Sequence, residues 1–373
     1  MKIGIVCYPT FGGSGVMATE LGMALADKGH EVHFITYNQP VRLDFISHNL
    51  HFHEVALEEY PLFQYQPYEL ALSSKMVEVV KEFSLDVLHV HYAIPHAYAA
   101  YMAKKMLKDE GIRVKVVTTL HGTDITLVGS HPSYKKAVEF SINQSDEVTA
   151  VSNSLREDTL RLFNIKKDIK VVYNFIDIAK YEMADQQECL RSAVANEDER
   201  ILTHVSNFRP VKRVLDVVKV FDKVQQKLPA KLLMVGDGPE RVKAESLARE
   251  LGISDKIIFL GNSNEVPKLL CYSDIFLLPS EAESFGLAAL EAMAANTAVI
   301  STNSGGLPEV NVHGETGFLS NLGDIEDMAK NVLTILESDA QLLQFKQNAK
   351  QHTKQFSIEK ILPEYVNIYQ ACF

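Results

Sequence analysis

Residues 274–294 read DIFLLPSEAESFGLAALEAMA, a run that contains a strand, a turn and the start of a helix. Asp274 to Leu278 is short, apolar and followed by Pro279, which is typical of a buried strand. Ser284 is a suitable N-cap for a helix that begins at Phe285 or Gly286. A buried strand that turns directly into a helix is the repeating unit of a parallel α/β sheet.

The same alternation continues on both sides of this stretch. Further helices are predicted at residues 14–28 and 214–226. Strands are predicted at residues 2–8, 31–37, 86–92, 114–120, 147–152 and 169–173 in the first half, and at 201–206, 231–235, 256–260, 274–278 and 298–302 in the second. Strands that are apolar along most of their length are expected where helices cover both faces of a sheet. The sequence therefore predicts an α/β fold with two doubly wound, Rossmann-like domains and a ligand cleft at the carboxyl ends of the strands.

Residues 178–200 interrupt this alternation, because they are polar, charged and poor in β-formers. We interpret them as the crossover between domains, and the alternative is a surface helix inside one domain. The expected organisation is a domain at 1–178, a second at 179–357 and a last helix at 358–373. A chain of 373 residues is long enough for two domains of about 150 residues each.

Composition limits the classes of partner. There are 37 lysines and arginines against 48 aspartates and glutamates, a net charge of −11, whereas a duplex-binding protein is usually basic. No apolar run approaches the ~18 residues of a membrane-spanning helix, and the first residues enter a strand instead of a signal-peptide pattern. The four cysteines form no CxxC pair. We expect a cytoplasmic protein that binds neither nucleic acid nor membrane.

Two turns are suited to an anionic ligand. The first strand leads into YPTFGGSG at residues 8–15, where glycines allow close approach of the backbone and a helix begins. Its spacing is not GxGxxG, and no acidic residue ends the second strand, which disfavours an NAD dehydrogenase. The second turn, FRPVKR at 208–213, places Arg209 and Lys212 where they could neutralise a diphosphate. The alternatives are a purely geometric glycine turn and a solvated charge cluster.

The helix expected within residues 274–294 would present its first backbone amides to the same anion. These amides belong to Phe285, Gly286 and Leu287. Glu283 and Glu291 are eight residues apart, about 80° past whole helical turns, so they fit two separate hydroxyl contacts better than one metal.

Histidines at strand ends give a weaker signal. His89 and His91 alternate like metal ligands, but no carboxylate partner is evident, so we expect ordinary strand-end side chains. His51 and His53 receive the same interpretation. No metal site is predicted.

The E-x7-E pattern from Glu283 to Glu291 resembles the retaining GT-B glycosyltransferases of family four, and the resemblance covers nearly the whole chain. It includes the GGSG turn, the cationic turn, GDGP at 236–239 and GGLPE at 305–309. The segments CYPTFGGSG (7–15), HVHYAIPH (89–96), TTLHGTDI (118–125) and HVSNFR (204–209) are similar to those of members that start bacillithiol biosynthesis. These members transfer N-acetylglucosamine from UDP-N-acetylglucosamine to the hydroxyl of L-malate.

The resemblance implies a GT-B fold whose last helix packs back on the first domain, and it implies roles on the donor side. Lys212 would bind the diphosphate, Glu283 a sugar hydroxyl and Glu291 the ribose. Backbone near Gly286 and Gly13 would cradle phosphate and sugar, and Asn262 would meet the uracil. His121 would lie against the donor sugar near the reacting carbon, although a lone strand-end histidine is more often structural. Where the family pattern has an arginine this chain has Asn207, and Arg209 could take over its charge.

On the acceptor side, a dicarboxylate calls for hydroxyls, amides and a cation. The candidates are Ser14, Tyr92, Thr119, Asn174 and Arg42, the last of which is equally well explained as a surface arginine. We expect no cofactor and no metal, and a homo-oligomer is left open. Two other functions are kept: transfer to a glycan or lipid acceptor, and a non-catalytic nucleotide-sugar sensor.

Overall fold

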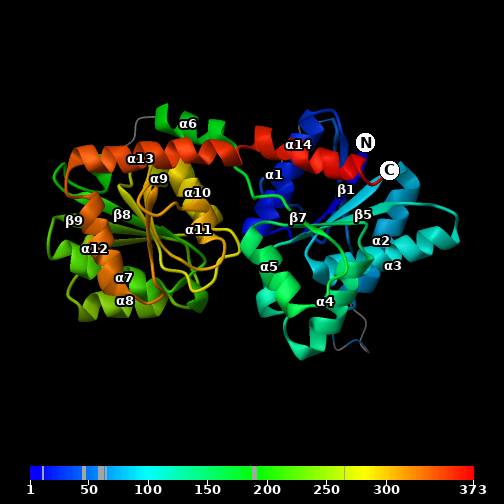
Figure 1. The fold of residues 1–373 in the computed structure, drawn as a ribbon, viewed down its shortest axis with the longest axis horizontal. Coiled ribbons are helices and arrows are strands. Elements are labelled where there is room, and N and C mark those ends of the chain that lie inside the picture. The colour runs from blue at the N-terminus through cyan, green and yellow to red at the C-terminus, as the bar shows by residue number, and fades with distance from the viewer. Residues whose placement is uncertain (11, 44–47, 58–62, 64, 187–190, 264) are drawn as a thin grey trace. The chain divides into compact units, whose positions relative to one another are not determined.

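The structure is a computed structural model that describes the chain except residues 11, 44–47, 58–62, 64, 187–190 and 264. The chain divides into two compact units, which are treated separately below. The first unit comprises residues 1–175 together with 358–373, and the second comprises residues 176–357. The last helix therefore belongs to the first unit although it follows the second in sequence (Figure 1).

The first unit is built on a parallel sheet with strand order β3-β2-β1-β4-β5-β6-β7 among the described residues. The strands are β1 (Lys2–Val6), β2 (Glu31–Thr36), β3 (Leu50–Glu54), β4 (Val87–His91), β5 (Lys115–Leu120), β6 (Glu147–Ala150) and β7 (Ile169–Val171). The order reverses between β1 and β4, and at such a reversal the loops that follow the two strands diverge and leave room for a ligand.

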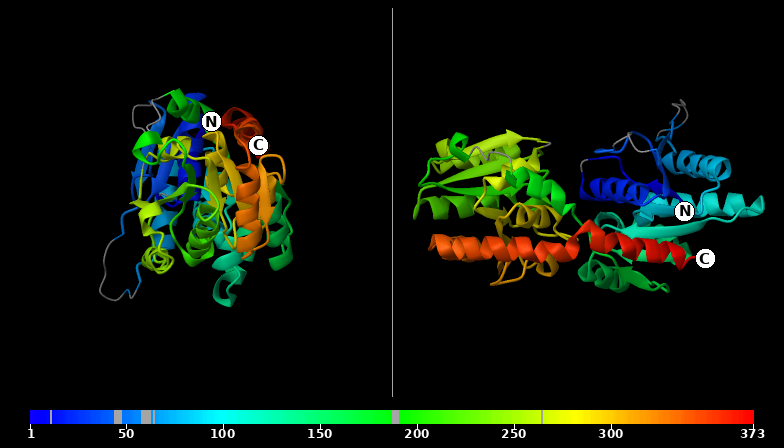
Figure 2. Two further views of the ribbon diagram at one scale, coloured as in Figure 1. Left: turned by 90° about the vertical axis from the view of Figure 1, so that its left-hand side faces the viewer. Right: turned by 90° about the horizontal axis from the view of Figure 1, so that it is seen from above.

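Helices cover both faces of this sheet. They are α1 (Gly13–Asp27), α2 (Tyr68–Phe83), α3 (Tyr98–Asp109), α4 (Pro132–Gln144), α5 (Asn153–Leu162) and α14 (Ile358–Gln370). Alternate strand residues point to opposite faces. Ile5 and Phe34 therefore pack with α1 and α14, whereas Ile35 and Val90 pack with α2 and α3. Tyr369 of α14 is fully buried in the first of these cores, and α14 lies beside α1 (Figure 2).

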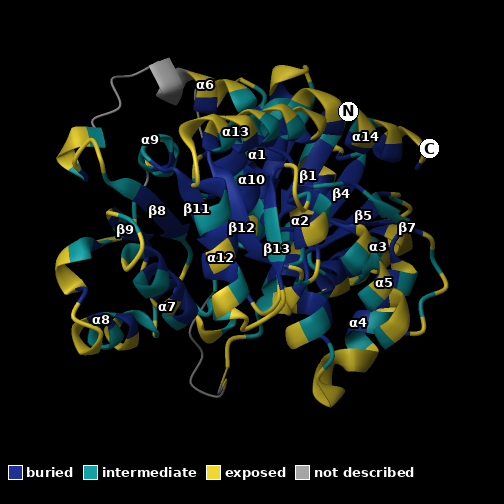
Figure 3. Ribbon diagram, turned by 60° about the vertical axis from the view of Figure 1, so that its left-hand side comes forward, coloured by how far each residue is buried: buried dark blue, intermediate teal, exposed yellow. Residues whose placement is uncertain are grey.

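The second unit repeats the plan with strand order β10-β9-β8-β11-β12-β13, again parallel. The strands are β8 (Arg200–Val205), β9 (Ala230–Val235), β10 (Ile257–Gly261), β11 (Ile275–Leu278), β12 (Ala298–Thr302) and β13 (Gly317–Ser320). The helices are α6 (Ile178–Gln186), α7 (Val214–Gln225), α8 (Arg241–Glu250), α9 (Val266–Cys271), α10 (Leu287–Ala294), α11 (Leu307–Val310), α12 (Ile325–Ile335) and α13 (Asp339–Thr353). The central strands of both sheets are buried, the edge strands β3 and β10 are partly exposed, and most exposed residues lie on helices and loops (Figure 3).

The predicted fold class, two Rossmann-like parallel α/β halves, is confirmed. The sequence did not predict β3 and β13. Residues 178–186 form helix α6 inside the second unit, which is the alternative left open for the 178–200 segment, and residues 187–190 lie outside the described residues. The prediction that Ser284 caps the helix is wrong, because α10 starts at Leu287 behind Gly286, which has φ 98° and no side-chain cap.

The helices were also compared with the length and apolarity that a membrane span needs. Among the described residues, each helix is too short or too polar to span a lipid bilayer.

Candidate functional site

In the second unit, the cationic turn lies where β8 ends, next to the loop that follows β11. Lys212 Nζ is 2.5 Å from Glu283 Oε1, and 22% and 13% of the two side chains are exposed. The backbone adds a second link between the two loops, because the Glu281 amide donates to the Val211 carbonyl. The structure thus brings together the predicted diphosphate cation and the predicted sugar-binding carboxylate at the order reversal between β8 and β11.

The backbone of Glu283 is held by the glycine turn that follows β12. The Gly306 amide donates to the Glu283 carbonyl at 2.8 Å, and Ser304 Oγ donates to the Glu281 carbonyl at 2.6 Å. Gly305 has φ +58°, and a Cβ there would lie 2.0 Å from the Glu283 carbonyl oxygen. Only a residue without a side chain permits this approach, so GGLPE positions the carboxylate-bearing loop.

The start of α10 has a related constraint. Gly286 is in the left-handed region, and a Cβ there would lie 2.6 Å from Leu307 Cδ2. Phe285 is buried against Phe356, so only its backbone can serve a ligand, and Leu287 is the first helical residue. Helix α10 thus presents the backbone amides of its first turn at the Glu283 loop.

The remaining predicted donor-side residues differ in exposure. Arg209 and Asn262 are exposed, whereas Glu291 is half-buried on α10. Asn262 follows the end of β10, and Gly261 at that end has φ +69° and accepts a hydrogen bond from the Gly236 amide. The placements of Arg209 and Asn262 are compatible with a ligand, and their roles remain predictions.

A buried histidine supports the end of β8. His204 is hydrogen-bonded through Nδ1 to the Leu277 carbonyl and through Nε2 to Ser206 Oγ, each at 2.8 Å. Burial lowers the pKa of His204 to about 4, so its ring is neutral at pH 7. The GDGP turn packs on the same strand end, where a Cβ on Gly236 would lie 1.8 Å from the Ser206 carbonyl oxygen.

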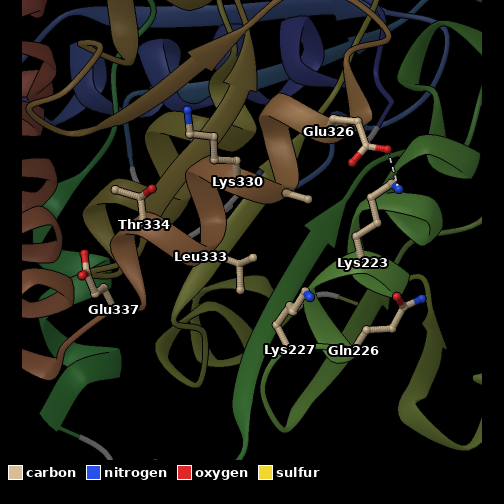
Figure 4. Close-up of a pocket in the computed structure, with 9 residues that line it drawn as sticks. Lys223, Gln226, Lys227, Glu326, Lys330, Leu333, Thr334 and Glu337 are labelled. Atoms are coloured by element: carbon tan, nitrogen blue, oxygen red, sulfur yellow. Dashed lines mark ion pairs between the residues drawn. The ribbon is translucent and has the colours of Figure 1, made fainter.

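A hollow of about 500 Å³ lies elsewhere in this unit, between α7 and α12 (Figure 4). Lys223 and Glu326 form an ion pair across it at 2.5 Å. Lys223 lies near the end of α7, which begins at Val214 just after Lys212, so roughly 14 Å of helix separates it from the cationic turn at about 1.5 Å per residue. The hollow therefore lies at the opposite ends of the strands from the Lys212–Glu283 pair.

In the first unit, the glycine turn after β1 meets the end of β4. A Cβ on Gly15 would lie 2.4 Å from the Tyr8 carbonyl oxygen, so this glycine is required by close packing of the turn. Gly13 is the exposed first residue of α1. Ser14 Oγ and the Tyr92 hydroxyl are hydrogen-bonded at 2.8 Å, which brings together two predicted acceptor-side residues.

The end of β5 is tied to the end of β4 through Asp124. Its carboxylate accepts hydrogen bonds from the amides of Ala93 at 2.8 Å, Gly122 at 3.0 Å and His121 at 3.2 Å. Burial raises the pKa of Asp124 to about 6, although these backbone hydrogen bonds oppose the shift. His91 Nδ1 and His121 Nε2 are hydrogen-bonded at 2.8 Å.

His121 itself is almost completely buried, and burial lowers its pKa to about 3. Its ring lies 5.2 Å from that of Tyr92, centroid to centroid. A neutral imidazole in this position can hydrogen-bond to a sugar or order its surroundings, but it does not supply a positive charge at neutral pH.

The other acceptor-side candidates are scattered. Thr119 is fully buried, and its hydroxyl is hydrogen-bonded to His89 Nε2 and Thr149 Oγ1, each at 2.7 Å. The structure therefore places this side chain inside the sheet and does not bring it to the Ser14–Tyr92 pair. Asn174 is buried after β7. Arg42 Nη1 is 3.4 Å from Glu20 Oε1 on α1, so its charge already has a partner.

Sequence reasoning did not single out Asp124, His91 or Gly305 as functional. Asp124 and His91 lie in segments that carry the family resemblance. Asp124 is four residues after the end of β5, and aspartate side chains in turns often accept hydrogen bonds from nearby backbone amides. The hydrogen bond between His91 and His121 depends on the parallel pairing of β4 with β5, which local patterns do not show.

Comparisons with known proteins agree across the chain. Residues 11–180 match the family model described as Glycosyltransferase Family 4, and residues 185–352 match Glycosyl transferases group 1. The N-acetyl-alpha-D-glucosaminyl L-malate synthase of Bacillus anthracis is 50% identical over 370 residues, covering 99% of this chain and 96% of that protein. An uncharacterized glycosyltransferase of Methanocaldococcus jannaschii is 28% identical, with 99% and 98% covered.

Solved structures show the same fold. Anabaena HepE in complex with UDP and glucose has a TM-score of 0.80 at 19% identity, with all of both chains covered. Sucrose-phosphate synthase from Thermosynechococcus elongatus has a TM-score of 0.79 at 21% identity, covering 100% of this chain and 98% of that chain. The chain contains two Rossmann-like sheets, matches both family models and is 50% identical to a relative over 99% of its length. It therefore belongs to the family-four glycosyltransferases of GT-B fold.

Proposed function

We propose that this protein transfers N-acetylglucosamine from UDP-N-acetylglucosamine to the hydroxyl of L-malate with retention of configuration, without a metal ion, as the first step of bacillithiol biosynthesis. The observation that carries the proposal is the 50% identity to the Bacillus anthracis synthase over 99% of the chain. A cytoplasmic location is part of the proposal, in keeping with four widely spaced cysteines.

The donor side is supported by the Lys212–Glu283 pair. When UDP-N-acetylglucosamine binds, the Lys212 ammonium moves to the diphosphate and the Glu283 carboxylate accepts a hydrogen bond from a sugar hydroxyl. The amides of the first turn of α10 add fixed partial charge at the phosphates. Preorganised donors of this kind stabilise the negative charge that develops on a leaving group, which is the reason for proposing a reaction without a metal.

In the transfer step, the bond from the anomeric carbon to the UDP oxygen breaks and a bond from that carbon to the malate hydroxyl oxygen forms on the same face. The malate hydroxyl proton passes to the leaving phosphate oxygen, so UDP and an α-glycoside result. His121, neutral at pH 7, lies against the sugar as a hydrogen-bonding group. Ser14, at the start of α1, and Tyr92, just after β4, supply hydroxyls to a malate carboxylate.

The test measures UDP release from UDP-N-acetylglucosamine with L-malate, in the presence and absence of EDTA. Succinate is the matched control, since it keeps both carboxylates and lacks the hydroxyl nucleophile. We expect release only with malate, equal rates with EDTA, and an α-anomeric product by NMR. Absence of malate-dependent release would refute the acceptor, and a β-anomeric product would refute retention. Loss of activity with EDTA at an unchanged thermal midpoint would refute metal independence of the transfer step.

Two variants test the site itself. Glu283→Ala should abolish most turnover, whereas Glu281→Ala, the exposed neighbour two residues earlier, should not.

Tight binding of UDP-N-acetylglucosamine without turnover on any acceptor would instead favour the nucleotide-sugar sensor.

A further inference from the structure

A second cluster of titratable side chains lies in the first unit, at the amino-terminal end of β2. In the register of β2 with β3, His33 is paired with His51, and Ile35 is paired with His53. Since strand neighbours in register share a face, the three imidazoles stand on the same side of the sheet. Phe83, the last residue of α2, packs against their rings at 4.6–6.0 Å between centroids.

Glu31 completes a set of potential metal ligands. Its Oε1 is 3.2 Å from His33 Nε2 and 3.8 Å from His51 Nε2, and one ligand atom from each of the three residues lies within 4.8 Å of the others. Two ligands at about 2.05 Å from a tetrahedral Zn²⁺ ion are about 3.3 Å apart. The separations from Glu31 are therefore near the value that one ion requires.

The remaining nitrogen of His33 is also held. His33 is fully buried, and its Nδ1 lies 2.9 Å from His53 Nε2. In metal sites the ligating histidine generally donates its other N–H to a polar neighbour, which orients the ring. Without an ion, Nε2 of His33 donates its proton to Glu31 and Nδ1 accepts from His53. An ion bound between Nε2 and Glu31 would replace that proton, and Nδ1 would then carry the N–H of the ring and donate it to His53.

The other oxygen of Glu31 is occupied, because Lys2 Nζ lies 3.2 Å from Oε2. This ion pair orients the carboxylate with Oε1 toward the histidines. His51 is the partly exposed member, with 36% of its side chain accessible, so an ion can reach the cluster from solvent.

We propose that Glu31, His33 and His51 form a binding site for a divalent transition-metal ion of the Zn²⁺ class, with His53 as the residue that positions His33. The mixture of imidazole nitrogen and carboxylate oxygen is the donor set that such ions prefer. The site ties β3, an edge strand of its sheet, to β2. It lies at the start of β2, whereas Tyr92 and His121 follow the carboxyl ends of β4 and β5, so the ion stabilises the first unit and takes no part in the transfer step.

The test uses the full chain, freed of metal with a chelator and then titrated with Zn²⁺ in a calorimeter and with Co²⁺ by visible absorption. We expect one ion per chain, a tetrahedral Co²⁺ spectrum, and a rise in the thermal midpoint with Zn²⁺. His51→Ala and Glu31→Gln should weaken binding at least 100-fold, and His53→Ala should weaken it about 10- to 100-fold.

Both ligand variants change partly exposed residues, so their folding can be verified from the thermal midpoint without metal. His48→Ala removes an exposed histidine three residues before His51 and should bind as the wild type does. Unchanged affinity in His51→Ala and Glu31→Gln, or no stoichiometric binding by the wild type, would overturn the proposal. These outcomes are read from binding alone, so they are independent of the proposed transferase reaction.

Discussion

Lys212 Nζ lies 2.5 Å from Glu283 Oε1, although the two residues are 71 positions apart in the chain. One follows β8 and the other follows β11, the two strands between which the order of the sheet reverses. An ion pair that remains partly exposed contributes little to stability, about 0–1 kcal/mol. Its loss should therefore change stability little, which allows the proposed role of the pair in donor binding to be tested separately from folding.

Lys212→Met should lower kcat/KM for UDP-N-acetylglucosamine at least 100-fold, because it removes the charge near the diphosphate and keeps the side-chain length. The free energy of unfolding should change by less than about 1 kcal/mol. Lys219→Met is the control, since Lys219 is an exposed α7 lysine 3.8 Å from Asp216. Steady-state UDP release and urea unfolding measure the two effects. A loss of less than threefold in Lys212→Met would contradict the assignment.

Gly305→Ala should reduce turnover, because its Cβ would lie 2.0 Å from the Glu283 carbonyl oxygen and displace that loop. Gly314→Ala is a closely matched control. Gly314 also has positive φ, +78°, but a Cβ there meets nothing within 4 Å. Gly314→Ala should cost roughly 1–2 kcal/mol of stability from backbone strain, measured by denaturant unfolding. Gly305→Ala should cost more, because its Cβ also clashes with backbone, and only Gly305→Ala should lower kcat. Equal kinetics in the two variants would show that the turn does not position Glu283.

Tyr92→Phe should raise the KM for malate roughly fivefold with a smaller effect on kcat, since it removes one hydroxyl worth about 1 kcal/mol from the Ser14–Tyr92 pair. The KM for UDP-N-acetylglucosamine should not change. Tyr98→Phe, at an exposed position on α3, is the control. If malate saturation is the same in both variants, the Tyr92 hydroxyl does not contact the acceptor.

Acid should destabilise the protein through its buried histidines. Burial lowers the pKa of His89 and His121 to about 3 and that of His96 to about 4, whereas the unfolded chain titrates near 6.5. Between these values the unfolded state binds more protons than the folded state, so stability is lost as pH falls below 6.5. Each such histidine contributes up to about 1.4 kcal/mol per pH unit.

His89→Gln isolates this effect, because glutamine can hydrogen-bond but does not titrate. His89 is hydrogen-bonded to Tyr369 and Thr119, and its ring lies 4.5 Å from that of His91. The slope of unfolding free energy against pH between 5 and 6.5 should decrease by up to about 1.4 kcal/mol per pH unit in this variant. His48→Gln, an exposed position, should keep the wild-type slope. An unchanged slope in His89→Gln would show that the folded protein accommodates a charged ring there.

Some parts of the candidate site were predicted correctly from the sequence and others were not. The loops after β8 and β11 and the glycine turn after β1 were recognised because turn chemistry and charge are local properties. The Ser284 cap was wrong because Gly286 has φ 98°, outside the helical region, so the helix starts only at Leu287. Thr119 was proposed as an acceptor contact, but the structure turns its hydroxyl toward His89 and Thr149 inside the sheet.

The sequence by itself determined the repeating strand-turn-helix units and therefore the two Rossmann-like halves, since periodicity and turn residues act over a few positions. It also determined the residue types at the ends of β8 and β11. Only the tertiary structure decided that Lys212 meets Glu283, that His91 meets His121, and that β3 sets His51 beside His33. Those contacts depend on which strands pair and in what register, and strand register is set by packing between segments far apart in the chain.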